Sequence, residues 1–223
     1  MEFKVFPNQK APRMFKNAFL QSLTVSHPIV INVMYSTIAI SLLCIYYFQI
    51  EHNFLKLALA FIVGFLAWTL GEYLLHRFLY HKIKDASYDT GLQYTLHGIH
   101  HQYPHDDGKI VLPPVPSILI AGLFFGIFYL IMGNYAFTVG SGFLMGYTAY
   151  QNVHWVTHKY APPQKGIHKY WWEAHNIHHF QQHDRSFGVT SPLWDIVFRT
   201  MPEKGRKTVT IKFAKEENKS SAT

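Results

Sequence analysis

The sequence predicts an all-α integral membrane protein, with about four transmembrane helices in two hairpins and a helical cap on one face. Three observations support this fold class. Apolar residues make up 49% of the 223 residues and charged residues only 15%, below the roughly 25% usual in soluble domains. The apolar residues fall in long blocks almost free of charge, and ten of the 15 histidines fall in four short clusters outside those blocks.

The first hairpin is predicted from two apolar blocks. Residues 29–48 carry no charge, and a helix of that length reaches about 30 Å, the thickness of the hydrocarbon core. Residues 49–53 form a short polar link to the second block, residues 54–75. Its one basic residue, Lys56, lies near its start, where a long side chain can extend to the interface.

The second hairpin is predicted from shorter blocks, residues 117–132 and 135–150, joined by Gly133-Asn134. Each is shorter than the roughly 20 residues of a full span, so this hairpin either crosses the bilayer or partly re-enters it. Glycines in both blocks would let the helices approach closely. The prolines of residues 113–116 are expected to end the polar segment that precedes the hairpin.

Charge predicts how the chain is oriented. If both hairpins cross and return, every Lys and Arg except Lys56 lies on one side, together with both termini and all four histidine clusters. The positive-inside rule makes that side cytoplasmic. This basic excess explains the net charge of +7 better than nucleic-acid binding, because no stretch mixes basic residues with exposed aromatic ones. We therefore predict a cytoplasmic N-terminal segment (1–28), a membrane-embedded domain (29–205) and a polar C-terminal tail (206–223).

The histidine clusters have the spacing of metal ligands. They are His76 and His81; His97, His100 and His101; His154 and His158; and His175, His178 and His179. Helical residues at i, i+3 and i+4 share a face, so each triplet presents three imidazoles along a narrow arc. The pair at i, i+5 is about 140° apart on an ideal helix. His76 and His81 therefore need a distorted helix end, or bind different ions.

The number of imidazoles predicts two metal ions. Ten exceed the three or four protein ligands of one zinc site and suit two ions with about five each. Soluble di-iron bundles use Glu and Glu-x-x-His pairs, and this sequence has no such repeat. The carboxylates near the clusters are expected either to accept hydrogen bonds from metal-bound imidazoles or to be solvated; they are Glu72, Glu173, Asp184 and Asp195. The cap is thus predicted to hold a histidine-rich dimetal centre.

The segments around the clusters resemble a known family. They are residues 71–78 (GEYLLHRF), 97–101 (HGIHH), 107–116 (DGKIVLPPVP), 178–180 (HHF) and 187–195 (FGVTSPLWD). Over about residues 70–205 the chain resembles the fatty acid hydroxylase/sterol desaturase superfamily. It is most similar to the fatty acid 2-hydroxylase branch, which acts on the acyl chain of ceramide-type sphingolipids.

The resemblance implies a set of ligands and cofactors. The ten clustered histidines would hold two iron ions (Fe2+/Fe3+), which zinc can replace, with O2 as cosubstrate and no catalytic side chain beyond the metal centre. Redox-inert zinc could not activate O2, so a hydroxylase requires iron. Relatives carry Tyr-Asp near the substrate where this chain has Tyr150 and Gln151, which leaves the head-group preference open.

The predicted function is a membrane-bound di-iron monooxygenase that inserts oxygen at C2 of a fatty acyl chain, free or in a ceramide-type lipid. Relatives often carry an N-terminal cytochrome b5 domain, which the 28 polar residues here cannot form. We therefore expect a separate electron donor of the cytochrome b5 or ferredoxin type. The alternatives are a sterol or carotenoid hydroxylase or desaturase of the same superfamily, and a non-catalytic zinc-binding membrane protein. The expected location is a bacterial inner membrane or the endoplasmic reticulum membrane.

Overall fold

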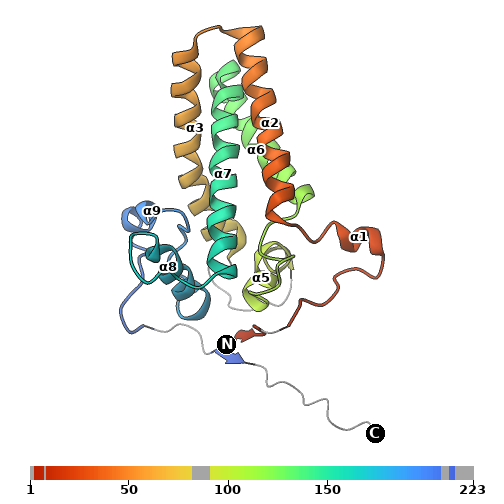
Figure 1. Ribbon diagram of the computed structural model, residues 1–223, viewed down its shortest axis with the longest axis vertical. Coiled ribbons are helices and arrows are strands. Elements are labelled where there is room, and N and C mark those ends of the chain that lie inside the picture. Colours follow the sequence, from red (N-terminus) through yellow and green to blue (C-terminus); the bar gives the residue numbers. More distant parts are fainter. Residues whose placement is uncertain (1–2, 8, 82–90, 207–210, 214–223) are drawn as a thin grey trace.

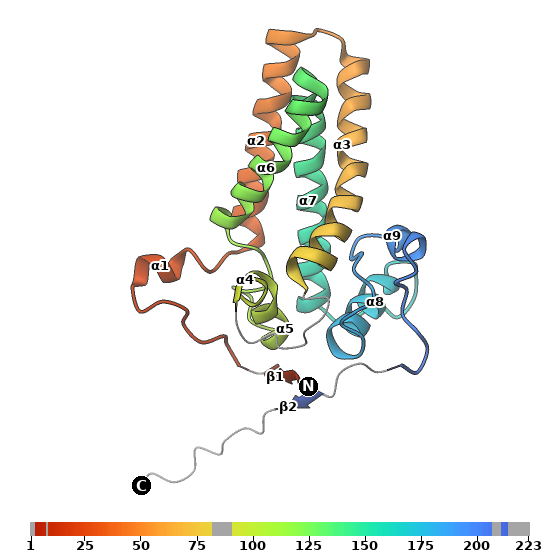
Figure 2. The same cartoon turned by 180° about the vertical axis from the view of Figure 1, so that it is seen from behind.

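Two long helical hairpins form an upright bundle, and shorter elements form a cap at one end of it (Figures 1 and 2). This computed structural model describes residues 3–7, 9–81, 91–206 and 211–213. The first hairpin consists of α2 (Pro28–Ile45) and α3 (Phe54–Leu74). The second consists of α6 (Pro114–Met132) and α7 (Ala136–Lys159), joined by one 3-10 turn, Gly133–Tyr135.

The first hairpin starts and ends where its sequence dictates. The imidazole of His27 accepts a hydrogen bond from the Ile29 amide (3.3 Å), and Pro28 occupies the first turn of α2, where a missing N–H costs nothing. The Asn53 side chain caps α3 by accepting from the Lys56 amide (3.0 Å). Both helices end in a π-helical stretch, Tyr46–Ile50 after α2 and Leu75–Tyr80 after α3.

The second hairpin extends beyond its apolar blocks at both ends. Helix α6 begins at Pro114, so Pro114 and Pro116 lie in its first turn, where proline is tolerated. The preceding polar segment therefore ends at these prolines, as expected, and the prolines also begin the helix. Helix α7 continues past Tyr150 to Lys159 and carries His154 and His158. The α6–α7 turn does not extend as far along the bundle as the α2–α3 turn (Figures 1 and 2).

Helix α7 is the centre of the bundle and packs against α2, α3 and α6. Glycines allow its close approach to α3. A Cβ added at Gly142 would overlap the backbone of Phe61, and one at Gly64 would overlap the backbone of Val139. The predicted role of glycine in close packing thus holds for this helix pair. It does not hold for Gly122 and Gly126 of α6, where an added Cβ meets nothing within 4 Å.

Replacing Gly142 with alanine is expected to lower the free energy of unfolding by about 1–3 kcal/mol, the usual cost of overpacking a tight interface. Gly126→Ala is the matched control, because its new methyl group enters open space. Unfolding of both variants in detergent measures the difference. Equal losses in the two variants would contradict the close α3–α7 contact.

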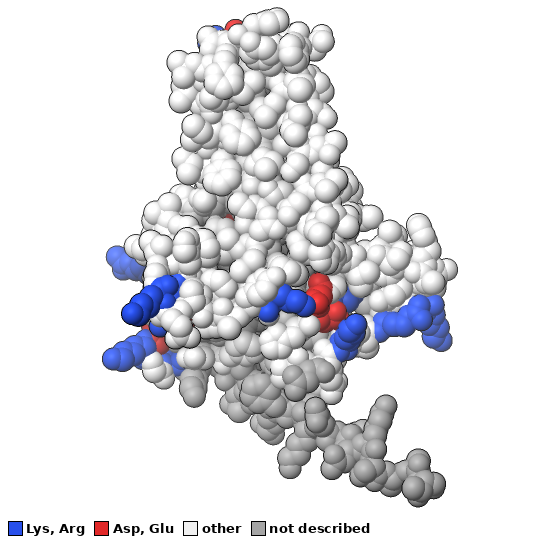
Figure 3. All heavy atoms as spheres, in the orientation of Figure 1, with Lys and Arg blue, Asp and Glu red and all other residues white. Residues whose placement is uncertain are grey.

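The surface of the bundle confirms a membrane protein. In the described part of the chain, three stretches are long and apolar enough to cross a bilayer: Pro28–Ile50, Phe54–Tyr80 and Pro114–Lys159, the last containing both α6 and α7. Leu130 and Ile131 are 86% and 75% exposed. Figure 3 shows a bundle surface almost without charge, with Lys and Arg gathered around the cap. The all-α membrane fold is confirmed, and the number of crossings stays a prediction.

The cap is built from short helices around the lower end of the bundle (Figures 1 and 2). They are α1 (Ala18–Ser22), α4 (Gly91–Gln93), α5 (Ile99–Gln102), α8 (Lys169–Phe180) and α9 (Leu193–Val197), with a π-helical stretch Tyr94–Gly98 between α4 and α5. Two short strands, β1 (Phe3–Val5) and β2 (Ile211–Phe213), pair in parallel. Strand β2 lies within the predicted tail 206–223, whose residues 207–210 and 214–223 lie outside the described part. The two boundaries between the three predicted segments stay predictions.

Candidate metal centre

The ten predicted histidine ligands converge where the bundle meets the cap. The π-helical end of α3 supplies one pair, α7 a second, the helical run 94–102 one triplet and α8 the other. Nine of the ten are buried, and His158 is partly exposed. Segments far apart in the sequence thus place their imidazoles in one buried volume.

The imidazoles form two groups of five, and the possible ligand atoms of each group lie within 4.8 Å of one another. The first group is His76, His81, His97, His101 and His178; the second is His100, His154, His158, His175 and His179. Each triplet is divided between the groups. Its i and i+4 members join one group and its i+3 member joins the other, so the triplet-bearing helices connect the two groups.

A π-helical stretch brings His76 and His81 together. The His81 amide donates to the His76 carbonyl (3.2 Å), an i to i+5 bond that is wider than an α-helical turn. The two rings then lie with centroids 4.9 Å apart, in the same group. Of the two alternatives that the sequence left open, the distorted helix end is the one that the structure adopts.

Backbone carbonyls orient two of the rings. Nδ1 of His76 donates to the Phe187 carbonyl and Nδ1 of His178 to the Arg185 carbonyl, each at 2.7 Å. Because Nδ1 then carries the proton, Nε2 keeps its lone pair and faces the group. A metal-bound imidazole usually has such a hydrogen bond on its other nitrogen. The two carbonyls therefore set the tautomer that metal binding needs.

The spacing of the nitrogens fits ligands of one ion. Nε2 of His97 lies 3.0 Å from Nε2 of both His76 and His101, and Nε2 of His154 lies 3.1 Å from that of His100. Two ligands at right angles on an ion about 2.1 Å away would lie about 3.0 Å apart. Both nitrogens of His179 are buried without a hydrogen-bond partner among the described residues, which is costly unless another group binds them. The residues present therefore fit two metal ions.

Burial keeps the imidazoles neutral. It lowers the pKa of the clustered histidines outside the spanning stretches well below the usual 6.5, and the neighbouring imidazoles lower it further; these are His81, His97, His100, His101, His175, His178 and His179. Metals bind the deprotonated ring. At neutral pH the site is therefore in the protonation state that metal binding requires.

We expect the metal-free protein to lose stability as the pH falls from 7 to 5. In the unfolded chain these histidines bind protons below about pH 6.5, whereas their lowered pKa keeps them neutral in the fold. Protons therefore favour the unfolded chain over this range. Thermal unfolding at a series of pH values tests the prediction, with His52→Ala as a control that keeps the pH dependence. A flat profile would contradict it.

The predicted contacts between carboxylates and imidazoles are not found in the described part of the chain. Glu72 instead accepts from the amides of Val189 (2.5 Å) and Thr190 (2.9 Å). Asp195 accepts from the amides of Phe187 (3.0 Å) and Gly188 (2.8 Å). These two buried carboxylates hold the segment whose Phe187 carbonyl orients His76.

The other two carboxylates form ion pairs on the surface. Glu173 pairs with Lys169 (3.2 Å) and Asp184 with Arg206 (2.7 Å). These pairs fit the alternative of solvated charge. The Phe187 and Arg185 carbonyls could not be predicted from the sequence, because a backbone acceptor has no side-chain pattern.

Tyr150 and Gln151 lie beside the metal groups. The Tyr150 ring stacks on His154, with centroids 5.6 Å apart and ring planes at 17°. The Gln151 amide donates to Asn32 Oδ1 (2.6 Å), which ties α7 to α2, and its oxygen is buried without a partner among the described residues. Both residues line a cavity of about 20 Å³. His97 and His154 also line it, so each group contributes one imidazole to this cavity.

Comparison with known proteins identifies the family. A family model described as Fatty acid hydroxylase matches residues 61–200, which include all ten histidines. The chain belongs to the fatty acid hydroxylase family. The resemblance found in the sequence is thereby confirmed.

Characterised relatives match the same region. A fatty acid 2-hydroxylase of Homo sapiens is 40% identical over 149 residues, which are 65% of this chain and 40% of the relative. A dihydroceramide fatty acyl 2-hydroxylase of Arabidopsis thaliana is 34% identical over 198 residues, 86% of this chain and 81% of that protein. The solved structure of full-length Scs7p, in which only the hydroxylase domain is visible, superimposes with a TM-score of 0.77 at 28% identity. This superposition covers 90% of this chain and 76% of the Scs7p chain. The chain spans about 40% of the length of the human relative.

Proposed function

We propose that this chain is a membrane-bound monooxygenase that inserts oxygen at C2 of a fatty acyl chain, free or in a ceramide-type lipid. One observation carries the proposal: two groups of five histidines, nine of the ten buried, lie at the end of an apolar helical bundle, and each group contributes one imidazole to a cavity there. The printed names of the relatives include fatty acid 2-hydroxylases and a dihydroceramide fatty acyl 2-hydroxylase, which supports this substrate class.

In the proposed enzyme the ten histidines are the metal ligands. Two iron ions held there would supply activation of O2, with one oxygen atom ending in the hydroxyl group, the other in water, and two electrons coming from a separate donor protein. The chain's own contribution is to position the reactants and exclude water. Neutral imidazoles hold the ions, the Phe187 and Arg185 carbonyls fix two of the rings, and apolar helices accept the lipid.

Tyr150 and Gln151 are proposed to contact the polar end of the substrate, because they line the cavity beside His97 and His154. The unpartnered oxygen of Gln151 can accept a hydrogen bond from an amide or hydroxyl group. We further propose that the cap and both termini are cytoplasmic, in a bacterial inner membrane or the endoplasmic reticulum membrane. A donor of the cytochrome b5 or ferredoxin type would then reach the metal centre through the cap.

Lipid mass spectrometry after expression of the wild type tests the proposal. Cells with the wild type are expected to accumulate 2-hydroxyacyl lipids, whereas cells with an empty vector or with His179→Ala are not. His52→Ala is the matched control, because His52 is exposed in the α2–α3 link. Wild-type 2-hydroxy lipid at the empty-vector level would overturn the proposal. O2 consumption by the iron-loaded protein with a reductant then separates another oxidation from a non-catalytic zinc protein, which would consume none.

A further inference from the structure

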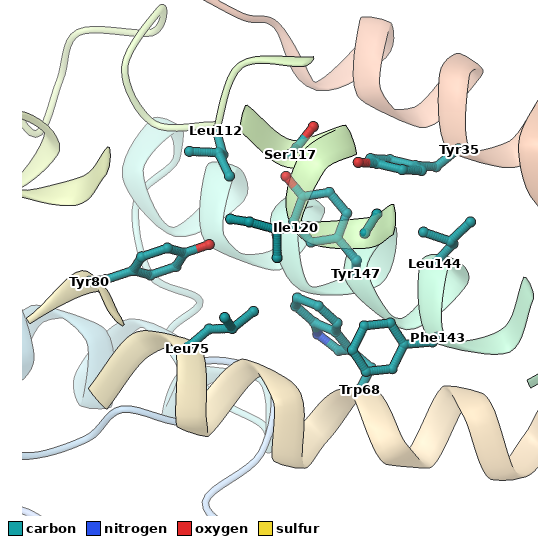
Figure 4. Close-up of a pocket in the computed structure, with 11 residues that line it drawn as sticks. Tyr35, Trp68, Leu75, Tyr80, Leu112, Ser117, Ile120, Phe143, Leu144 and Tyr147 are labelled. Carbon is teal, nitrogen blue, oxygen red and sulfur yellow. The ribbon is translucent and has the colours of Figure 1, made fainter. Parts of the chain in front are cut away.

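Three cavities follow one another from the candidate metal centre into the bundle. The first is the cavity beside His97 and His154. The second, of about 20 Å³, shares Tyr80, Leu112 and Tyr147 with the first (Figure 4). The third, of about 210 Å³, shares four residues with the second: Tyr35, Ala121, Phe143 and Leu144. Because neighbouring cavities share lining residues, the three lie along one path, although they are not joined into a single cavity.

The third cavity lies between three helices within the membrane-spanning stretches. Helix α6 contributes Ile118, Ala121, Gly122 and Phe125, which at i, i+3, i+4 and i+7 form one face. Helix α2 contributes side chains from two turns and α7 residues from about one turn. The backbones of helices α2 and α6 approach each other at few points. The cavity is therefore an apolar cleft that faces the bilayer between them.

We infer that this path holds the tail of the acyl chain, and that the third cavity limits the chain length the enzyme accepts. The inference rests on the proposed function, because it places C2 of the substrate beside His97 and His154 in the first cavity. An acyl tail is the occupant that fits, since the path starts at an oxidation site and ends in apolar walls open to lipid. Gly122 is the residue that keeps the third cavity wide.

The first and second cavities are the narrow part of this path, with about 20 Å³ each. A volume of this size suits one or two waters rather than a lipid chain, so side chains must move for a tail to pass. Tyr35 and Tyr147 pack edge to face there, with centroids 5.3 Å apart. The Tyr147 hydroxyl is buried without a hydrogen-bond partner among the described residues. Among the described residues, packing alone therefore holds the Tyr147 ring, which lines both narrow cavities.

Two glycines of α6 provide a matched test. A Cβ added at Gly122 meets no atom within 4 Å, and Gly122 lines the third cavity. Gly126, one turn further along the helix, has the same freedom but does not line that cavity. Leucine at position 122 therefore fills the cleft, whereas leucine at position 126 leaves it open. Both substitutions add the same side chain to the same helix.

The first measurement is hydroxylation of free fatty acids of increasing length by the iron-loaded enzyme. Gly122→Leu is expected to lower the ratio of long-chain to short-chain product about tenfold or more, the size of effect that a methylene-sized change makes in an apolar pocket. Gly126→Leu is expected to change the ratio less than about twofold. An unchanged ratio in an active Gly122→Leu enzyme would overturn the inference and leave the proposed function standing.

The second measurement needs no activity. Metal-free protein is irradiated with a fatty acid that carries a diazirine at its terminal carbon, and the adducts are located by mass spectrometry. Adducts on the α6 and α7 walls of the third cavity are expected in the wild type and in Gly126→Leu, and are expected to be lost in Gly122→Leu. Adducts confined to the cap, or equally strong in all three proteins, would overturn the inference.

Discussion

Replacing His97 with alanine is expected to remove one of two metal ions and to abolish hydroxylation. His97 lies at the centre of the first group, with its Nε2 3.0 Å from two other ring nitrogens. Losing a residue that only supports a ligand costs about 10- to 100-fold in metal affinity or activity, and losing the proposed ligand itself is expected to exceed that range. The measurements are metal content of the purified protein and 2-hydroxy lipid production.

Because the histidines form two groups, the loss of a metal ion can be assigned to one group. His97→Ala and His179→Ala change different groups, so each is expected to lower the metal content from about two ions to about one, and the double variant to near zero. His52→Ala should keep both ions. If His97→Ala retained two ions and full activity, the proposed ligand set would be wrong. If each single variant lost both ions, the groups would bind metal as one unit.

The sequence predicted which histidines come together but not how they divide. Helical spacing fixes the angle between side chains on one helix, so the pairs and triplets could be recognised and two ions inferred. Which ring faces which group depends on how helices from distant segments pack. His100 thus joins the α7 histidines, while His97 and His101 face His76. The i, i+5 spacing of His76 and His81 signalled a distortion, and packing decided that it is a π-helical stretch.

The membrane fold was predictable because apolar blocks of helical length have few alternatives in a bilayer. The ends of the helices were less predictable. Helix α7 continues through His154 and His158 to Lys159, with His154 buried and Lys159 exposed. The roles of Glu72 and Asp195 were not predicted, since most of their hydrogen-bond donors are backbone amides of a loop. The sequence marks such a loop only by its residues, Phe187 to Thr190, and not by where its amides point.

Replacing Asp195 with asparagine is expected to loosen that loop and to weaken metal binding in the first group only. Asp195 is fully buried and accepts hydrogen bonds from the Phe187 and Gly188 amides and from Thr200 Oγ1 (2.7 Å). Burial raises the pKa of this carboxyl, and these hydrogen bonds act in the opposite direction. Asparagine has the same shape but only one accepting oxygen. At least one buried N–H then faces another donor, which costs about 1–3 kcal/mol of stability.

The effect on the metal follows from the Phe187 carbonyl. It accepts from Nδ1 of His76, so a displaced loop releases that ring, and the first group is expected to bind its ion about 10- to 100-fold more weakly. Competition with a chelator measures each ion's affinity. Glu173→Gln is the matched control, because Glu173 lies on the ligand-bearing helix α8 in an exposed ion pair worth at most about 0.5 kcal/mol. If both ions bind equally more weakly, the substitution destabilises the protein in general. If only the ion of the first group binds more weakly, Asp195 acts through the carbonyl that orients His76.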